Sequence, residues 1–387
     1  MSSSELNRNI KLLFIFKFLT MLIFLGPIFI LFLQQKFTLS QAVFLQGVFT
    51  VSTGIFEVPA GVIADKIGTK MALILENLIG AIAISLYAVS EHFWQFLILE
   101  TAIGLSFALQ SGSDSALLYD TLLALKREDE YKKIYGKMTF FAMIGATASG
   151  ILGGIMAKYS YELTFFATSI ALFFAFIIAL FLKEPPIKGK TKEKGSIKEA
   201  IKALNGNKEI KSIILFTAII ASFNQVLFFI YQPYYKMAGV DVAWFGVIFA
   251  SFQIINGFAS KYAYKYEEIF GFKRGIWILA ITVAVSIFLL GNIVGVFSFV
   301  FIYLQQMVRG IRPILVSDYI NKKVDSNQRV TSLSLVEFVK RILGFGNILM
   351  LTALTEIFKL TTVINIVGVV YVAILLLIYR VLKKQNL

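Results

Sequence analysis

The chain has 387 residues, 58% of them hydrophobic, and a formal net charge of +14 at pH 7. Its mean hydropathy of +0.78 is too high for a water-soluble globular protein and indicates a polytopic membrane protein. The basic charge does not indicate nucleic-acid binding, because Lys and Arg lie mostly in short segments between apolar runs.

Apolar runs of about 20 residues are long enough to span the hydrocarbon core as helices. The first run is too long for a signal-peptide core and lacks a small-residue cleavage site, so we interpret it as a retained helix. The sequence predicts an all-α membrane protein with twelve spans, at residues 10–33, 41–64, 71–90, 93–118, 137–158, 162–182, 211–235, 241–263, 273–291, 293–318, 332–356 and 359–382.

The distribution of basic residues predicts the orientation of these spans. One alternating set of connections holds nearly all of the Lys and Arg residues, whereas the other holds only Lys36, Lys158, Lys236 and Lys359. Because basic loops stay on the inner side, we expect a multi-pass protein of the cytoplasmic membrane with both termini cytoplasmic.

Residues 61–70, GVIADKIGTK, join the second and third spans. So short a joint makes the two helices antiparallel neighbours and places the joint in water or among headgroups, and Gly61 and Gly68 permit a tight turn. The segment resembles the loop between helices two and three of major facilitator superfamily transporters, with Thr69 at a position that is usually basic. The resemblance assigns Gly61, Asp65, Lys66, Gly68 and Lys70 to a conformational gate.

The resemblance covers essentially the whole chain and implies two pseudo-symmetric six-helix bundles, residues 1–182 and 211–387, around a midplane cavity. The connection at 183–210 is Lys-rich, and its Ser196 and Glu199 fit a capping box, so it forms either an amphipathic helix on the inner leaflet or a solvated tether. The halves repeat: SALLYD ends at Asp120 and PILVSD ends at Asp318. With Arg329, these two acids complete the predicted gate.

Residues 145–154, GATASGILGG, resemble a glycine-rich signature of proton-coupled exporters, with Ser149-Gly150 where Gly-Pro is usual. The alternative role is close helix packing by small residues. Residues 111–120 and 309–318 resemble a bacterial branch that is often grouped with drug exporters.

Ionisable side chains inside a span cost several kcal/mol unless they are paired or hydrated. Counted along the spans, nine of them share a layer in the cytoplasmic half: Lys17, Glu57, Glu76, Asp114, Arg309, Arg312, Glu337, Lys340 and Arg341. They form either an inner gate of ion pairs, joined by Asp65 at a helix N-terminus, or a site where one acid titrates during transport.

Glu100 stands apart in the outer half of its span, with no cation apparent at that depth. We predict that it couples transport to protons, with Asp114 and Glu57 as further candidates; the alternative is a carboxyl hydrogen-bonded within the bundle.

For the substrate, the sequence predicts a pocket with aromatic walls and amide groups, which suits amphipathic molecules. Its candidate residues come from spans seven, eight and ten: Asn224, Gln225, Phe228, Tyr231, Gln253, Asn256, Gln305 and Gln306. The tyrosines of span seven fit an outer interfacial belt equally well, and Pro233 predicts a kink there.

The sequence has no P-loop, no Cys and a single His, His92, in an outer loop, so we expect no enzyme activity, no cofactor and no metal. The predicted function is secondary transport by a monomer, as export of an amphipathic drug-like compound in exchange for protons. Uptake or efflux of a polar or anionic metabolite, and a non-transporting membrane sensor, are the alternatives.

Overall fold

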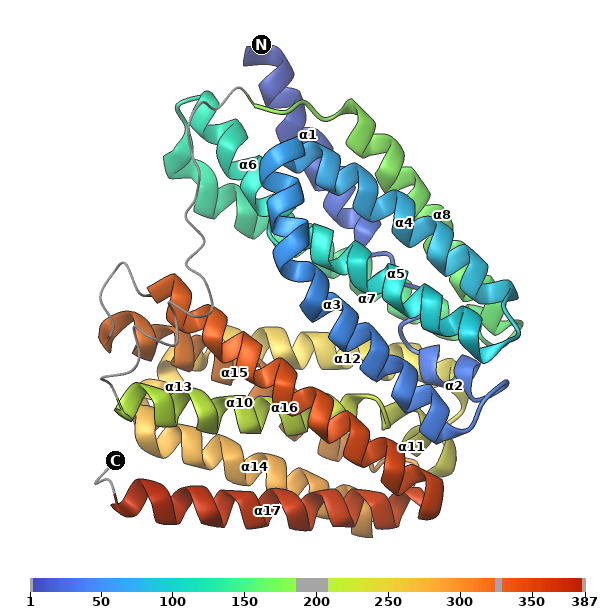
Figure 1. The fold of residues 1–387 in the computed structure, drawn as a ribbon, viewed down its shortest axis with the longest axis vertical. Helices are drawn as coiled ribbons and strands as arrows, with labels where there is room; N and C mark the ends of the chain where they lie inside the picture. The colour runs from blue at the N-terminus through green and yellow to red at the C-terminus, as the bar shows by residue number, and fades with distance from the viewer. Residues whose placement is uncertain (1–2, 186–207, 324–328, 385–387) are drawn as a thin grey trace. The chain divides into compact units, whose positions relative to one another are not determined.

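A computed structural model describes residues 3–185, 208–323 and 329–384, and within these ranges every regular element is a helix (Figure 1). The chain forms two compact units. The first contains Met1–Phe37, Leu45–Lys192 and Val242–Ala250, and the second contains Thr38–Phe44, Glu193–Asp241 and Ser251–Leu387. The predicted helix in the 183–210 connection lies outside the described residues.

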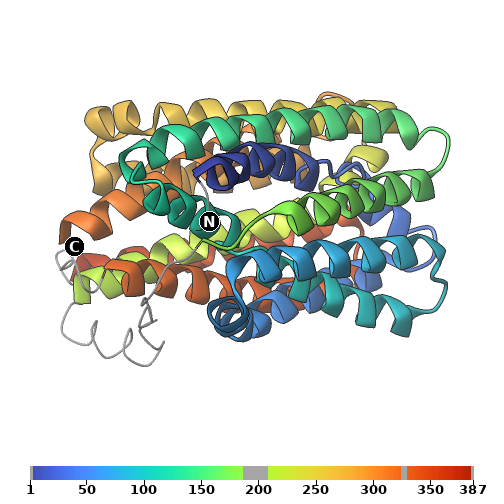
Figure 2. The ribbon, with the colours of Figure 1, turned by 90° about the horizontal axis from the view of Figure 1, so that it is seen from above.

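The N-terminal unit is built on two central helices. Helix α1 packs against α6, α7 and α8, while α4 packs against α5 and α8; Figure 2 shows α1, in dark blue, alongside α7, in green. The elements of this part of the chain are α1 (Ser3–Thr20), α2 (Phe29–Leu33), α3 (Leu39–Ile67), α4 (Thr69–Val89), α5 (Phe93–Gln110), α6 (Ser113–Ala124), η1 (Glu128–Glu130), α7 (Tyr131–Met156) and α8 (Tyr161–Phe181).

In the second unit α10 packs against α16, and α14 packs between α15 and α17. The elements of the second half of the chain are α10 (Lys208–Phe228), α11 (Tyr231–Met237), α12 (Val242–Lys261), α13 (Ala263–Phe270), α14 (Phe272–Asn292), α15 (Val300–Lys323), α16 (Arg329–Ile357) and α17 (Leu360–Lys384). Long helices are expected in the apolar interior of a bilayer, because each helix satisfies its backbone hydrogen bonds internally.

Three of the predicted spans are each divided into two helical segments, and from the sequence we expected a kink only in the seventh. The first breaks between α1 and α2, where Pro27 lacks a backbone donor and restricts the residue before it. The fourth breaks at Gly112, which has φ of 81°, and continues as α6 to Ala124. The seventh breaks between α10 and α11, which places Pro233 in the first turn of α11 and confirms the expected kink.

Within the described residues, ten helices are long and apolar enough to cross a membrane. Two of the predicted spans are not among them. Helix α1 has 18 residues but carries four charged side chains, Glu5, Arg8, Lys11 and Lys17. Helix α15 carries Gln305, Gln306, Arg309 and Arg312, which lower its hydropathy. Both segments are nevertheless helical at the predicted places in the chain.

The turn between α3 and α4 is stabilised by the carboxylate of Glu184, a residue that follows α8 in the chain. Gly68 adopts φ of 94°, which favours glycine. Glu184 accepts hydrogen bonds from the backbone nitrogens of Thr69 (3.0 Å) and Lys70 (2.7 Å) and from the Thr69 hydroxyl (3.0 Å). An acid at a helix N-terminus satisfies free N–H groups and complements the helix dipole.

The residue before Glu184 is fastened as well. Asn9 on α1 donates from Nδ2 to the carbonyl of Lys183 (2.7 Å) and accepts from the Lys183 backbone nitrogen at Oδ1 (2.9 Å). The same amide donates to the hydroxyl of Thr121 on α6 (3.2 Å). The chain leaving α8 therefore joins α1, α4 and α6 in one polar clasp.

Replacing Glu184 by alanine is expected to cost about 1 kcal/mol of stability, because the first turn of α4 loses its cap. Thermal unfolding of the purified protein in detergent measures the effect. Lys183→Ala is the matched control, since only its backbone takes part in the clasp. Equal melting temperatures for the two variants would show that the cap contributes nothing.

Candidate functional site

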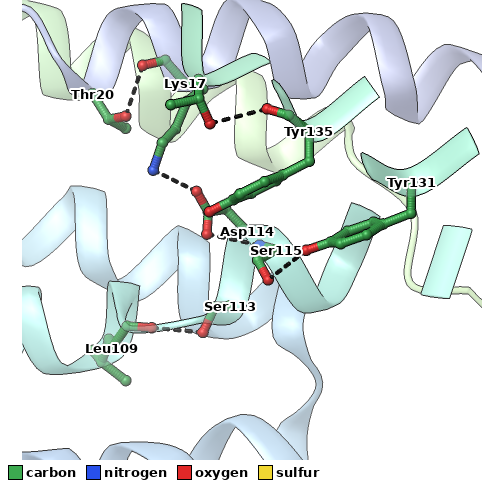
Figure 3. A network of polar contacts seen from close by, with 9 residues as sticks. Lys17, Thr20, Leu109, Ser113, Asp114, Ser115, Tyr131 and Tyr135 are labelled. Atoms are coloured by element: carbon green, nitrogen blue, oxygen red, sulfur yellow. Dashed lines mark hydrogen bonds and ion pairs between the residues drawn. The ribbon is translucent and has the colours of Figure 1, made fainter. Parts of the chain in front are cut away.

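An ion pair between the half-buried Lys17 on α1 and the buried Asp114 on α6 joins two helices of the N-terminal unit (Figure 3). Lys17 Nζ on α1 lies 2.5 Å from Oδ2 of Asp114, whose residue is 4% exposed. The break at Gly112 sets Asp114 in the first turn of α6, where Oδ1 accepts the Ser115 backbone N–H at 2.7 Å. The helix N-terminus and the ammonium group both favour a negative charge at this place.

A second acid adjoins this pair. Glu76 on α4 is 4% exposed, and within the described part of the chain its Oε2 has no hydrogen-bond partner. Its carboxyl is hydrogen-bonded by Gln110, attracted by Lys17 and repelled by Asp114. We call Lys17, Glu76 and Asp114 the N-terminal charge cluster. With both acids ionised, the cluster has one more negative than positive charge, which is costly away from water.

Helix α7 supplies the aromatic side of this cluster. The ring of Tyr135 lies beside the Asp114 carboxylate, as Figure 3 shows, and Tyr135 interacts electrostatically with both Asp114 and Lys17. Tyr131 stacks on Tyr135 with ring centroids 5.5 Å apart, and its hydroxyl lies 3.1 Å from that of Ser115. The ion pair is thus enclosed by α1, α4, α6 and α7.

Glu100 has a different environment. It is 2% exposed on α5, and its Oε1 accepts hydrogen bonds from Gln46 Nε2 (3.1 Å) and the Tyr87 hydroxyl (2.9 Å). The Tyr87 ring in turn contacts Phe96 and stacks on Phe165. Among the described residues no cation forms an ion pair with Glu100. Two neutral donors in an aromatic pocket fit the hydrogen-bonded alternative and leave the coupling role a prediction.

The predicted substrate residues of spans seven and ten meet in one buried network. Tyr231 donates to Gln305 Oε1 (2.5 Å), and Gln305 Nε2 donates to the Ser286 hydroxyl (2.9 Å). Asn224 donates to the Gln305 backbone carbonyl (3.0 Å). Ser286 on α14 was not predicted from the sequence, because a lone serine in an apolar span has no distinguishing pattern.

Two arginines lie next to this network on α15. The guanidinium of Arg309 lies over the ring of Phe228, 5.3 Å from its centroid, and Arg309 is exposed. Arg312 is 8% exposed, and its Nη1 lies 3.5 Å from the Thr217 carbonyl. Within the described residues neither arginine forms an ion pair, whereas Lys340 pairs with Glu337 on α16. The structure brings Asn224, Phe228, Tyr231 and Gln305 together, and their role in substrate binding stays a prediction.

The remaining substrate candidates are less closely connected. Gln306 is buried beside Gln305, and Gln225 is half-buried on α10. Gln253 and Asn256 are half-buried on α12, where Asn256 Oδ1 lies 3.5 Å from the Ser260 hydroxyl.

The predicted gate residues are placed only in part. Gly61 and Lys66 lie in the last turns of α3, Gly68 and Lys70 form the turn described above, and Asp318 pairs with Lys322 on its own helix. Asp120 lies on α6, while Glu57 on α3 and Arg341 on α16 are half-buried. The side chains of Asp65 and Arg329 lie outside the described part of the structure, so the gate remains a prediction.

The glycine-rich segment packs α7 closely against α1 and the residues that follow it. A Cβ at Gly145 would lie 2.8 Å from the Phe18 carbonyl oxygen, and one at Gly153 would lie 2.0 Å from that of Phe24. The packing role that we gave as the alternative accounts for these two glycines.

Comparison with known proteins identifies the family. The model of the Major Facilitator Superfamily matches residues 12–346. The chain belongs to this superfamily. It therefore has the multi-pass, all-α membrane fold of this transporter family, and it is not an enzyme.

Curated relatives include "Multidrug resistance protein MdtG" of Salmonella choleraesuis (strain SC-B67), 27% identical over 166 residues that cover 41% of this chain and 39% of the relative. The protein of the same name from Proteus mirabilis (strain HI4320) is 26% identical over 161 residues, with the same coverage. The alignments thus span about two fifths of these superfamily relatives.

Solved structures share the superfamily fold over nearly the whole chain. The nucleoside transporter NupG matches with a TM-score of 0.82 at 14% identity, covering 97% of this chain and 99% of that one. A D-xylose-proton symporter matches with a TM-score of 0.68 at 14% identity, covering 95% of both chains. At these identities the likeness shows the fold alone.

Proposed function

We propose that this transporter exports a small amphipathic compound across the cytoplasmic membrane in exchange for protons. The N-terminal charge cluster is the observation that supports this proposal. Two buried carboxylates, Glu76 and Asp114, face one ammonium group, so the cluster is electrically neutral only when it holds one proton. The names of the MdtG relatives favour a drug-like substrate.

A mechanism follows from this charge balance. In the occluded state the proton resides on one of the two acids, and the remaining carboxylate pairs with Lys17. When water reaches the cluster, hydration stabilises the second negative charge and the proton leaves. Because Asp114 and Glu76 stand on different helices, movement of α4 relative to α6 changes how strongly each acid contacts Lys17. Proton release is thereby linked to a change of conformation.

The rest of the proposal follows the sequence prediction. Residues 1–182 and 211–387 act as two bundles joined by 183–210, with both termini on the cytoplasmic side, and they rock about a substrate site in alternating access. The conformational gate at 61–70 is part of the proposed cycle. We further propose that the monomer is the working unit.

Purified protein in liposomes with an imposed pH gradient tests the proposal. An exchanger accumulates its substrate in vesicles with an acidic interior, because protons leave as substrate enters. A panel of amphipathic compounds is assayed with the gradient in both directions and with the gradient collapsed by an ionophore. Accumulation driven by an acidic exterior would identify a symporter instead, and accumulation that ignores the gradient would refute proton coupling.

A further inference from the structure

We infer that the second unit binds an aromatic organic anion, with Arg309 and Arg312 holding the anionic group and Phe228 and Tyr231 holding the ring. This inference names the substrate class for the proposed function and rests on that function. It starts from charge. Arg309 and Arg312 are three residues apart on α15, so they lie on the same helix face and repel each other.

The described residues supply little negative charge to offset these two cations. Glu337 on α16 attracts Arg312, but its ion pair is with Lys340. The remaining partners are neutral: the Thr217 carbonyl for Arg312 and the Phe228 ring for Arg309. Cations inside a span are costly unless an anion or water compensates them, and such residues commonly mark a substrate path. A bound carboxylate or sulfonate supplies the missing charge through planar, paired hydrogen bonds.

Aromatic rings border the same place. The Phe228 ring lies under Arg309, and its centroid is 5.7 Å from that of Tyr231 in an edge-to-face arrangement. Tyr231 also contacts Phe252 at 6.1 Å. The hydrogen bond from Tyr231 to Gln305 fixes this ring in the buried network. An aromatic ligand extends the edge-to-face series while its anionic group reaches the arginines.

Buried polar atoms with no hydrogen-bond partner are the independent observation. Within the described part of the chain, the Asn224 side-chain oxygen and the Gln306 side-chain nitrogen have none, although these residues are only 3% and 2% exposed. Buried polar groups are nearly always satisfied, so an unsatisfied acceptor and donor beside the network indicate a ligand or water that bonds to them. The substrate class is therefore an aromatic anion that also carries a neutral polar group.

Three probes of one shape test this inference on the full-length protein in detergent. 1-Naphthoate, 1-naphthalenemethanol and 1-naphthylmethylammonium share a ring and differ in charge, and calorimetry measures their binding. We expect the anion to bind about tenfold or more tightly than the cation. Arg309→Gln and Arg312→Gln should each remove most of that preference, while Lys359→Gln, which removes an exposed charge elsewhere, should leave it unchanged.

Two outcomes overturn the inference: wild-type protein that binds the anion no more tightly than the alcohol, or arginine variants that weaken all three probes equally. The second would show that the arginines support packing or pair with acids in another conformation. Arg309→Lys separates charge from shape, since it keeps the charge and should retain part of the preference. Gradient-driven transport without anion preference would support the proposed function and refute this inference. Anion preference without gradient-driven transport would support the binding site and refute the proposed proton coupling.

Discussion

Replacing Asp114 by asparagine is expected to abolish accumulation driven by a pH gradient while the protein still exchanges substrate across the membrane. In this variant Glu76 alone faces Lys17, so the N-terminal charge cluster is neutral without a proton. Glu76→Gln reaches the same neutral state by leaving the Lys17–Asp114 pair intact. Both changes should lower gradient-driven accumulation by about tenfold or more. A factor of this size lies within the range that ordinary coupling free energies produce.

The measurement compares two assays on the same liposomes. Gradient-driven accumulation reports coupling, and exchange of labelled for unlabelled substrate without a gradient reports an intact transport cycle. Glu91→Gln is the matched control, because this acid is exposed and pairs with Lys36 outside the cluster. Loss of both activities in the Asp114 variant would indicate a folding defect, which thermal unfolding of the same sample detects.

Glu100→Gln decides between the two candidate sites for proton coupling. Glutamine can accept the hydrogen bonds that Glu100 receives from Gln46 and Tyr87, so this variant should keep its fold. Coupling that survives in Glu100→Gln and disappears in Glu76→Gln assigns the proton to the N-terminal charge cluster. The reverse result assigns it to Glu100 and refutes the mechanism proposed above.

The sequence predicted the spans because the bilayer leaves the backbone few options. A run of apolar residues must close its hydrogen bonds within one helix, and length then sets the number of crossings. Depth along each span also placed Lys17 and Asp114 in one layer although 97 residues separate them, but it did not predict that these two residues pair. The charge of a side chain and its depth along a span can be predicted from the sequence without knowing which helices are neighbours.

Features that depend on which helices touch could not be predicted. The clasp joins Asn9 to Lys183 and Glu184 to Thr69, partners that no periodic pattern connects. The sequence placed Glu76 in the layer of ionisable residues. Only the packing of α4 near α6 shows that it is the second acid beside the Lys17–Asp114 ion pair. The break at Gly112 was missed because a single glycine in an apolar run is compatible with a continuous helix.

Gly153→Ala is expected to destabilise the protein by about 1–3 kcal/mol or more, the cost of forcing extra atoms into a packed interior. The added Cβ would lie 2.0 Å from the Phe24 carbonyl oxygen, and a backbone atom cannot move aside as a flexible side chain can. The segment after α1 must therefore shift away from α7. A lower melting temperature in detergent is the expected observation.

Gly136→Ala is the matched control on the same helix, because a Cβ there meets no atom within 4 Å. Alanine is favoured over glycine inside a helix by about 1 kcal/mol, so this variant should be more stable than the wild type. Opposite shifts from the same substitution separate close packing from helix propensity. A Gly153→Ala variant at least as stable as the wild type would show that α7 does not press against the residues following α1, and would remove the packing explanation for the glycine-rich segment.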